Sequence, residues 1–366
     1  MDRRTTLSLA AASAIMAGTA SGCGEPVAVL GDNPGVIRVV AGIPEEFGNV
    51  TDSLALRSHL NQPSGVVVAE DGVVYVADRR NRRVVAITSS GRFRIVLDHL
   101  RCVGECLVQP LHLALDGADG LYVSDRLGQR IWRIDLVTGA AAVFLGTGEA
   151  GESADGSPVS PGTEITGPRG ISVGPAGDLY FAESQLNRIR VARADGTLGT
   201  VAGTGERGFT GDGGLAPEAK LDFPTDIAVS GQTMYVMDAG NNRIRAVDLP
   251  GGNIRTIAGS GVRGFGGDGG SALDALFDVP ESIAVSPEGT TLYIADSRNH
   301  RVRALQIESG IISTLVGSGD TRFGGDLIDA GAASLELPFG VATSDFGLLF
   351  VGDTGHEIVW RMPVSF

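Results

Sequence analysis

A stretch of 22 residues recurs six times along the chain, and this repetition limits the possible folds more than any other feature. The clearest copy, PTDIAVSGQTMYVMDAGNNRIR, spans residues 224–245. Its pattern predicts an apolar strand, a turn, a second strand, a polar turn and the beginning of a third strand. The six copies begin at prolines spaced 47 to 58 residues apart: Pro63, Pro110, Pro168, Pro224, Pro280 and Pro338. Periods of this size are typical of repeat arrays and propellers.

The position of a fourth strand predicts how the repeats are joined. An apolar heptad follows the third strand of each of the first five repeats, as in TLGTVAG at residues 197–203, but none follows the sixth. A similar heptad, VIRVVAG, stands alone before the first repeat at residues 36–42. Pairing it with the last repeat would close a ring and remove the strand edges that an open series leaves unpaired. We therefore predict an all-β fold, a six-bladed β-propeller over residues 34–366 that is closed by the N-terminal strand joining the last blade.

Length and charge agree with one globular domain that does not bind nucleic acid. A propeller accommodates 366 residues in one domain because it adds blades and does not enlarge a single core. The formal net charge is −14. Binding through nucleic-acid phosphates requires clustered Lys and Arg that release counterions. We therefore expect no nucleic-acid partner.

The first residues resemble an export signal. Arg3 and Arg4 precede an apolar run over residues 7–20, which is shorter than the roughly 20 apolar residues of a membrane span. The run ends in ASGC, which resembles the lipobox of bacterial lipoproteins and would make Cys23 the lipidated first residue of the mature chain. An ordinary cleaved signal, in which Cys23 is incidental, is the alternative, and the arginine pair also resembles a twin-arginine signal.

These features predict the parts of the chain outside the propeller and its location. Residues 1–22 are expected to be an export signal and residues 23–33 a tether. The protein is then exported to the cell envelope, periplasmic or extracellular, and touches the membrane through its lipid anchor only. In an exported protein, Cys102 and Cys106, which are close together in RCVGEC, predict a small disulfide loop.

Charged residues recur at fixed places in the repeats. Each second strand ends in a carboxylate: Asp78, Asp125, Glu183, Asp238, Asp296 and Asp353. An arginine follows five residues later in the first five repeats: Arg83, Arg130, Arg188, Arg243 and Arg301. Because a role repeated in every blade is more economically architectural, we expect the same ion pair or turn hydrogen bond in each blade. Three aspartates of the long Gly-rich loops, Asp212, Asp268 and Asp326, are predicted to cap short helical turns.

The recurring pattern P-x-x-I-A-V, Y-V-x-D, N-x-R-I and TVAG resembles the NHL repeat. Six copies resemble the six-bladed NHL propellers, and with the signal they are similar to exported bacterial NHL-repeat lipoproteins. The resemblance implies a propeller but leaves the function open, because the family includes RNA-binding and protein-binding modules, sensor domains and a few enzymes. Those enzymes are peptidyl-hydroxyglycine amidating lyases, lactonases and a streptogramin lyase.

The resemblance also implies where a site would lie, because in these propellers the starts of the inner strands converge on one mouth of the central channel. Two residues after each proline are Gly65, His112, Gly170, Asp226, Ser282 and Gly340. One residue after each proline are Ser64, Leu111, Arg169, Thr225, Glu281 and Phe339. The amidating lyases hold zinc with three His near such positions, whereas this chain offers His112 alone.

Two functions remain open at this stage. The first is a noncatalytic, lipid-anchored scaffold that binds a protein, peptide or glycan on a loop face, with no cofactor, through Arg169, Thr225, Ser282 and Phe339. The alternative is a metal-dependent lyase or hydrolase, of the lactonase or amidating-lyase type, at the channel mouth. It would use His112, Asp226 and Glu281 as acid and base, and His112 with Asp226 could hold a divalent metal, Ca or Zn. A water-filled polar channel, in which His112 packs against Leu111, is the other interpretation of these residues.

Overall fold

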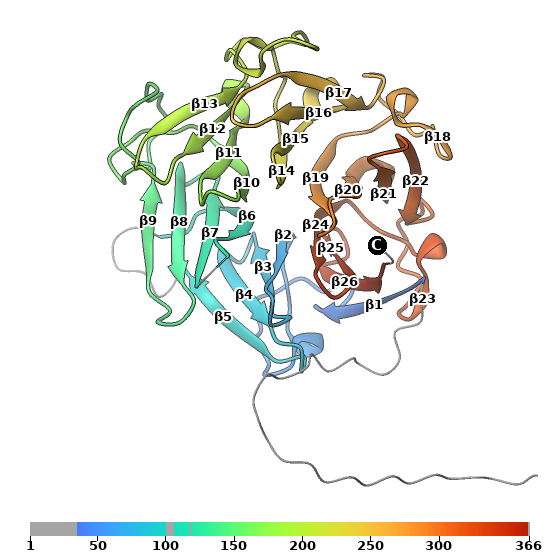
Figure 1. Ribbon diagram of the computed structural model, residues 1–366. Helices are drawn as coiled ribbons and strands as arrows, with labels where there is room; N and C mark the ends of the chain where they lie inside the picture. The colour runs from blue at the N-terminus through green and yellow to red at the C-terminus, as the bar shows by residue number, and fades with distance from the viewer. Residues whose placement is uncertain (1–34, 100–105, 118, 365–366) are drawn as a thin grey trace, which may run out of the picture.

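The computed structural model describes residues 35–99, 106–117 and 119–364 and is built from six antiparallel β-sheets arranged around a central axis (Figure 1). The inner strands are β2 (Pro63–Val68), β6 (Pro110–Leu115), β10 (Pro168–Val173), β14 (Asp226–Ser230), β19 (Pro280–Val285) and β24 (Pro338–Ser344). Each contacts the inner strand of the next blade, and β24 contacts β2, so the ring is closed. The predicted six-bladed propeller is confirmed.

The remaining strands follow outward in each blade. The second strands are β3 (Val74–Asp78), β7 (Gly120–Asp125), β11 (Leu179–Glu183), β15 (Thr233–Asp238), β20 (Thr291–Asp296) and β25 (Leu348–Asp353). The third strands are β4 (Arg83–Ile87), β8 (Arg130–Asp135), β12 (Arg188–Ala192), β16 (Arg243–Asp248), β21 (Arg301–Gln306) and β26 (Ile358–Pro363). The fourth strands are β5 (Phe93–Asp98), β9 (Ala141–Leu145), β13 (Leu198–Ala202), β17 (Ile254–Ala258), β22 (Ile311–Val316) and, in the sixth blade, β1 (Val36–Ala41).

Short elements lie at the outer edges and in the turns. The strands β18 (Gly270–Ser271) and β23 (Ile328–Asp329) add to the outer edges of the fifth and sixth blades. Short 3-10 turns are η1 (Ala55–Arg57), η2 (Ser184–Leu186), η3 (Ala216–Glu218), η4 (Ala239–Asn241), η5 (Ala272–Asp274), η6 (Ser297–Asn299) and η7 (Ala330–Ala332). No helix among the described residues is long and apolar enough to cross a membrane.

The N-terminal strand closes the ring as the displaced heptad predicts. Strand β1 pairs antiparallel with β26, and Val39 lies opposite Trp360. Ile37 is fully buried and belongs to the same apolar cluster as Trp360 and Leu349. The hydrophobic core consists of such clusters, most of which combine residues of two neighbouring blades. Blade-to-blade burial therefore holds the ring together, and β1 contributes to it at the point of closure.

The carboxylate at the end of each second strand is fully buried and accepts a backbone N–H from the segment that leads into its own blade. The donors, in blade order, are the amides of Asn61, Gln109, Thr166, Asp222, Asp278 and Glu336. The N–O distances are 2.7 Å for Asp78 and 2.8 Å for Asp238. The same backbone hydrogen bond to the acid thus recurs in every blade, but its donor lies in the entry segment and is not the arginine that the sequence pattern suggested.

The predicted ion pair with the arginine five residues later forms in only some blades. Arg83 binds Asp78 at 2.6 Å and Arg188 binds Glu183 at 2.7 Å. In the fourth blade the partner of Asp238 is Arg245, seven residues later, at 3.4 Å. Arg243 instead lies over the ring of Phe209, 4.0 Å from its centre. The same ring also lies 4.9 Å from the guanidinium of Arg245, but only Arg245, which is fully buried, reaches the acid.

In the fifth and sixth blades, too, the buried acid is bound by the residue seven positions later and not by the one five positions later. Arg303 binds Asp296 in the fifth blade, and the indole N–H of Trp360 donates to Asp353 at 2.8 Å in the sixth. Both donors stand seven residues after the acid. The first blade has Val85 at this place, which cannot donate, and there the earlier arginine turns inward.

The prediction that the loop aspartates cap helical turns is wrong. Asp212 accepts hydrogen bonds from Arg245 at 2.8 Å and from the Thr256 hydroxyl at 2.7 Å. Asp268 makes the equivalent contacts with Arg303 and Thr314, and Asp326 accepts the backbone N–H of Val39 in the closing strand. Ser271 and Asp329 accept the turn amides of η5 and η7 instead. For Asp212 and Asp268, a buried guanidinium attracts the carboxylate more strongly than a single exposed turn amide does.

Replacement of Ile37 by alanine tests the closure. We expect Ile37→Ala to lower the free energy of unfolding by about 2–5 kcal/mol, because it leaves a cavity between β1 and the sixth blade. Ile311→Ala, at an exposed position of the fourth strand of the fifth blade, is the control and should change stability by less than about 1 kcal/mol. Denaturant unfolding measures both. Equal, small effects of the two substitutions would contradict closure by β1.

Substitution of the two arginines of the fourth blade tests the change of partner. Arg245→Met should cost about 3–5 kcal/mol, because it leaves the buried Asp238 without its cationic partner. Arg243→Met should cost about 1 kcal/mol, since this arginine is partly exposed and lies over Phe209. Thermal or denaturant unfolding measures the two losses of stability. A larger loss of stability for Arg243→Met than for Arg245→Met would support the Arg243–Asp238 ion pair expected from the sequence.

Candidate functional site

Charged and aromatic side chains from several blades meet where the inner strands begin, at one end of the central axis. Figure 1 shows these inner strands surrounding the axis. We call the group the axial cluster, and it consists of Arg79, His112, Arg126, Arg169, Asp226, Glu281 and Phe339. Five of these residues stand at the first or second place after the repeat prolines, as the sequence predicts. The cluster therefore results from the repeat period, which brings equivalent positions to the same end of the ring.

His112 and Asp226 form a buried pair. Their Nδ1 and Oδ1 atoms are 3.3 Å apart, and each side chain is at most 6% exposed. The second carboxylate oxygen of Asp226 accepts the backbone N–H of Ile283 at 2.9 Å. The ring of His112 lies 5.4 Å from that of Phe339. The structure thus brings together two of the three residues predicted as acid and base.

The neighbouring glycines make room for this pair. A Cβ atom at Gly170 would lie 2.2 Å from Oδ1 of Asp226, and one at Gly65 would lie 2.7 Å from Cα of His112. Both distances are far below van der Waals contact. Glycine at these places of the first and third blades therefore allows the adjacent inner strands to approach with His112 and Asp226 between them.

Burial sets the protonation of the pair. It raises the pKa of Asp226 to about 7. Burial, followed by the charges of Arg169 and Arg79, lowers the pKa of His112 well below its usual value. Near neutral pH the imidazole is therefore uncharged and Asp226 is only partly ionised, and Nδ1 of His112 lies 3.3 Å from the Asp226 carboxyl group. The Nε2 atom is buried and has no hydrogen-bond partner, so it is available as a base or as an acceptor for a donor group of a ligand.

Glu281, the third predicted residue, does not join the pair. Its carboxylate accepts a hydrogen bond from Nη2 of Arg169 in an ion pair. The guanidinium of Arg169 also lies over two aromatic rings, 5.4 Å from the centre of Phe223 and 5.9 Å from that of Phe339. Arg169, predicted as a binding residue, thus links the acid of the fifth blade to the aromatic residue of the sixth.

The described residues offer little for a metal ion. They contain no group of three or more His, Cys, Asp or Glu side chains that could hold one. His112 and Asp226 supply two donors, whereas catalytic zinc sites use three protein ligands. The metal interpretation therefore depends on this pair alone.

Sequence reasoning missed Arg79 and Arg126. They follow directly after the acids Asp78 and Asp125, where the other four blades have Ser184, Ala239, Ser297 and Thr354. The guanidinium of Arg79 lies 5.6 Å from the centre of the Phe339 ring, and its Nη2 donates to Gln62. A comparison of the six residues that follow the acids, in addition to those that follow the prolines, would have found both arginines.

The other predicted binding residues join blades. Thr225 is buried, and its hydroxyl donates to the carbonyl of Pro280 in the next blade at 3.3 Å. Ser282 is buried and its hydroxyl accepts the backbone N–H of Val341 at 3.5 Å. These contacts hold the ring of inner strands around the axial cluster.

Three predictions concern residues at or beyond the limits of the described chain. Cys23, with the expected signal and tether, lies outside the described residues, and so does Cys102. Cys106 takes part in a disulfide. The pairing of Cys102 with Cys106 stays a prediction.

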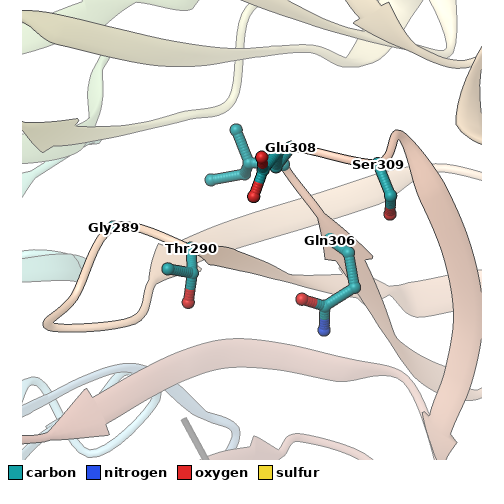
Figure 2. Close-up of a pocket in the computed structure, with 6 residues that line it drawn as sticks. Gly289, Thr290, Gln306, Glu308 and Ser309 are labelled. Atoms are coloured by element: carbon teal, nitrogen blue, oxygen red, sulfur yellow. The ribbon is translucent and has the colours of Figure 1, made fainter.

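A pocket of about 570 Å³ lies at the other end of the fifth blade (Figure 2). Its lining comes from the β19–β20 and β21–β22 turns: Gly289, Thr290, Gln306, Ile307, Glu308 and Ser309. Pro280 pairs with Asp296 at the end of the blade near the axial cluster, and Val285 pairs with Leu292 at the opposite end. The pocket is therefore separate from the axial cluster.

Comparison with known proteins shows which proteins share the repeat and the fold. Residues 60–87 match the family model described as the NHL repeat. NHL repeat-containing protein 2 from Bos taurus is 25% identical over 303 residues, which cover 72% of this chain and 41% of that protein. The chain spans less than half the length of the first curated relatives it matches.

Solved structures of low sequence identity share the fold. An auxiliary nutrient binding protein from Bacteroides thetaiotaomicron has a TM-score of 0.66 at 14% identity, with 89% of this chain and 75% of that chain covered. A gluconolactonase from Xanthomonas campestris has a TM-score of 0.57 at 16% identity, with 92% and 99% covered. The six recurring sequence copies, the closed ring of six sheets and the matching repeat model together identify the chain as an NHL-repeat six-bladed β-propeller.

Proposed function

We propose that this propeller is an exported, noncatalytic binding protein that takes a peptide or glycan ligand at the axial cluster. The observation that supports it most is the unused hydrogen-bonding capacity of that cluster. Nε2 of His112 is buried without a partner, and so are the Nε atoms of Arg79, Arg126 and Arg169. Buried polar atoms are normally satisfied, so a bound ligand that supplies the missing partners accounts for their state.

The disposition of the carboxylates favours binding over catalysis. Glu281 is held by Arg169, and the remaining pair, His112 and Asp226, has no third donor for a metal among the described residues. An auxiliary nutrient binding protein has the same fold, which agrees with a binding role in the cell envelope. Export through residues 1–22 and anchoring through Cys23 belong to this proposal and follow from the signal and the ASGC sequence.

A lyase or hydrolase at the same place is the second candidate, because one observation favours it. An uncharged imidazole oriented by a carboxylate, with Nε2 free, is the arrangement of a general base. A gluconolactonase shares the fold. The two functions differ in the fate of the ligand: a binding protein releases it unchanged, whereas an enzyme releases a product.

A ligand panel tests the proposed function. Residues 24–366 are mixed with acidic and neutral oligosaccharides and short peptides, and the unfolding temperature is measured. A ligand at about 100 times its Kd should stabilise the protein by about 2.7 kcal/mol. Mass spectrometry should recover it unchanged, and His112→Gln should weaken its binding.

His59→Gln, in a loop outside the axial cluster, is the matched control and should leave binding unchanged. Conversion of a panel compound by the wild-type protein, with loss of conversion in His112→Gln, would replace the binding proposal by the enzyme.

Burial of the ionised form of Asp226 lowers the stability of the protein, and the pH dependence of the free energy of unfolding measures this effect. Its pKa is raised from 3.8 to about 7 in the folded state, so the folded protein binds a proton that the unfolded chain releases between these values. Stability from this group is fully present below pH 3.8 and is lost as the pH rises through about 7.

Asp226→Asn removes this dependence. We expect it to raise the free energy of unfolding by about 2–4 kcal/mol near pH 8 and to change it little near pH 4, since one pKa unit corresponds to about 1.4 kcal/mol. Glu218→Gln, at an exposed position, is the control. Denaturant titrations at both pH values provide the comparison, and an equal effect at the two would show that Asp226 is not held at a raised pKa.

A further inference from the structure

The three arginines of the axial cluster carry an inference about the ligand, which rests on the proposed binding function. We propose that Arg79, Arg126 and Arg169 form a receptor for a carboxylate group of the ligand, and that a hydroxyl or N–H group beside this carboxylate donates to His112. The ligand is then a small acid with an adjacent hydrogen-bond donor, as in an acidic sugar or an acidic peptide.

The arginines come from three consecutive blades and lie close enough to interact electrostatically. Arg79 and Arg169 both lie over the ring of Phe339, with guanidinium carbons 5.6 and 5.9 Å from its centre. Arg126 interacts electrostatically with both of the other arginines. Arg169 is 6% exposed, whereas Arg79 and Arg126 are half-buried. The receptor therefore has a buried floor and two arginines that solvent reaches.

The acids around the arginines do not balance their charge. Glu281 pairs with Arg169. Glu357 lies near Arg79, but burial raises its pKa to about 7, so it is only partly ionised at neutral pH. The pKa values of Arg79 and Arg126 are lowered, first by burial and then by the neighbouring arginines, while Glu281 acts in the opposite direction. Asp226, which interacts with Arg169, is also only partly ionised at neutral pH because its pKa is about 7. One full and two partial negative charges thus face three arginines, and an excess of positive charge remains in a chain whose formal net charge is −14.

The donors of the arginines are also incompletely used. The Nε atoms of all three are buried without a hydrogen-bond partner. Among the described residues, the side chain of Arg126 makes no hydrogen bond or ion pair. The guanidinium fork matches the two oxygens of a carboxylate, and charge-assisted hydrogen bonds of this kind are stronger than neutral ones. The Arg169–Glu281 pair shows that a carboxylate already fits against this group.

His112 requires that the ligand also carry a hydrogen-bond donor. Its uncharged imidazole has Nδ1 3.3 Å from a carboxyl oxygen of Asp226 and presents Nε2, which has no partner, as an acceptor. An inorganic anion without a proton to donate leaves this acceptor unsatisfied. A hydroxyl or N–H group next to the carboxylate satisfies it, which is why we favour an organic acid of this kind.

Calorimetric titration of the wild-type protein with three probes tests the receptor. Trigalacturonate and triglutamate carry a carboxylate next to a hydroxyl or an N–H donor, and trigalacturonate methyl ester lacks the charge. EDTA and constant ionic strength exclude effects of metal ions and general screening. We expect at least one acid to bind, and which of the two binds identifies sugar or peptide. The ester should bind roughly 10- to 100-fold more weakly than the free acid.

Variants locate the binding. Arg126→Gln and Arg79→Gln should each weaken binding of the acid roughly 10- to 100-fold, and Arg126→Lys should retain part of it, because lysine keeps the charge and loses the fork. Arg193→Gln, at an exposed position outside the axial cluster, removes the same charge and should have no effect. Unfolding temperatures of the variants verify that each is folded.

The outcomes separate this inference from the proposed function. Binding of neither acid, or equal binding of trigalacturonate and its ester, overturns the carboxylate receptor. A neutral ligand that binds equally to wild type and Arg126→Gln also overturns it and leaves the binding function standing. If no compound of any charge binds, the proposed function fails with it.

Discussion

The arrangement of the blades depends on the buried carboxylate at the end of each second strand. This group accepts a backbone N–H from the segment that enters the same blade, at distances such as 2.7 Å for Asp78 and 2.8 Å for Asp353. A second donor, an arginine or a tryptophan, satisfies the acid from the third strand in each blade. A buried acid without such partners would be strongly destabilising, so entry segment, second strand and third strand are fixed together. The start of every inner strand is placed by this connection.

The repeat builds the frame, and departures from the repeat build the site. Equivalent positions reach the same end of the axis in all blades, but only one blade places His there and only one places Asp. The glycines of the preceding blades, Gly65 and Gly170, give these two side chains the room to meet. In the same way, Arg79 and Arg126 occupy positions where other blades have small residues. Positive charge, an aromatic ring and an unused imidazole nitrogen are therefore concentrated at one end of an otherwise regular ring.

Much of the propeller architecture could be predicted from the sequence because the blade sequence recurs six times. The period, the order of the strands and the closure by residues 36–42 each follow from a comparison of copies, and the approach of His112 to Asp226 follows from their equivalent positions. The partners of the acids could not be predicted in this way. In the fourth blade Arg245 reaches Asp238 while Arg243 does not, and both lie over Phe209, an aromatic residue that belongs to a loop of variable sequence.

The charged partners across the axis were unpredictable for a related reason. Glu281 and His112 stand at nearby places of different repeats, but the long side chain of Arg169 reaches Glu281 and forms an ion pair with it. Glu281 therefore does not pair with His112. Side chains that cross the axis follow no repeat period, since each meets residues of blades that are not its sequence neighbours. The pairing leaves His112 and Asp226 without a third acid and leaves two arginines with a surplus of positive charge. The same contact thus weakens the case for a reactive site and strengthens the case for an anion held without being transformed.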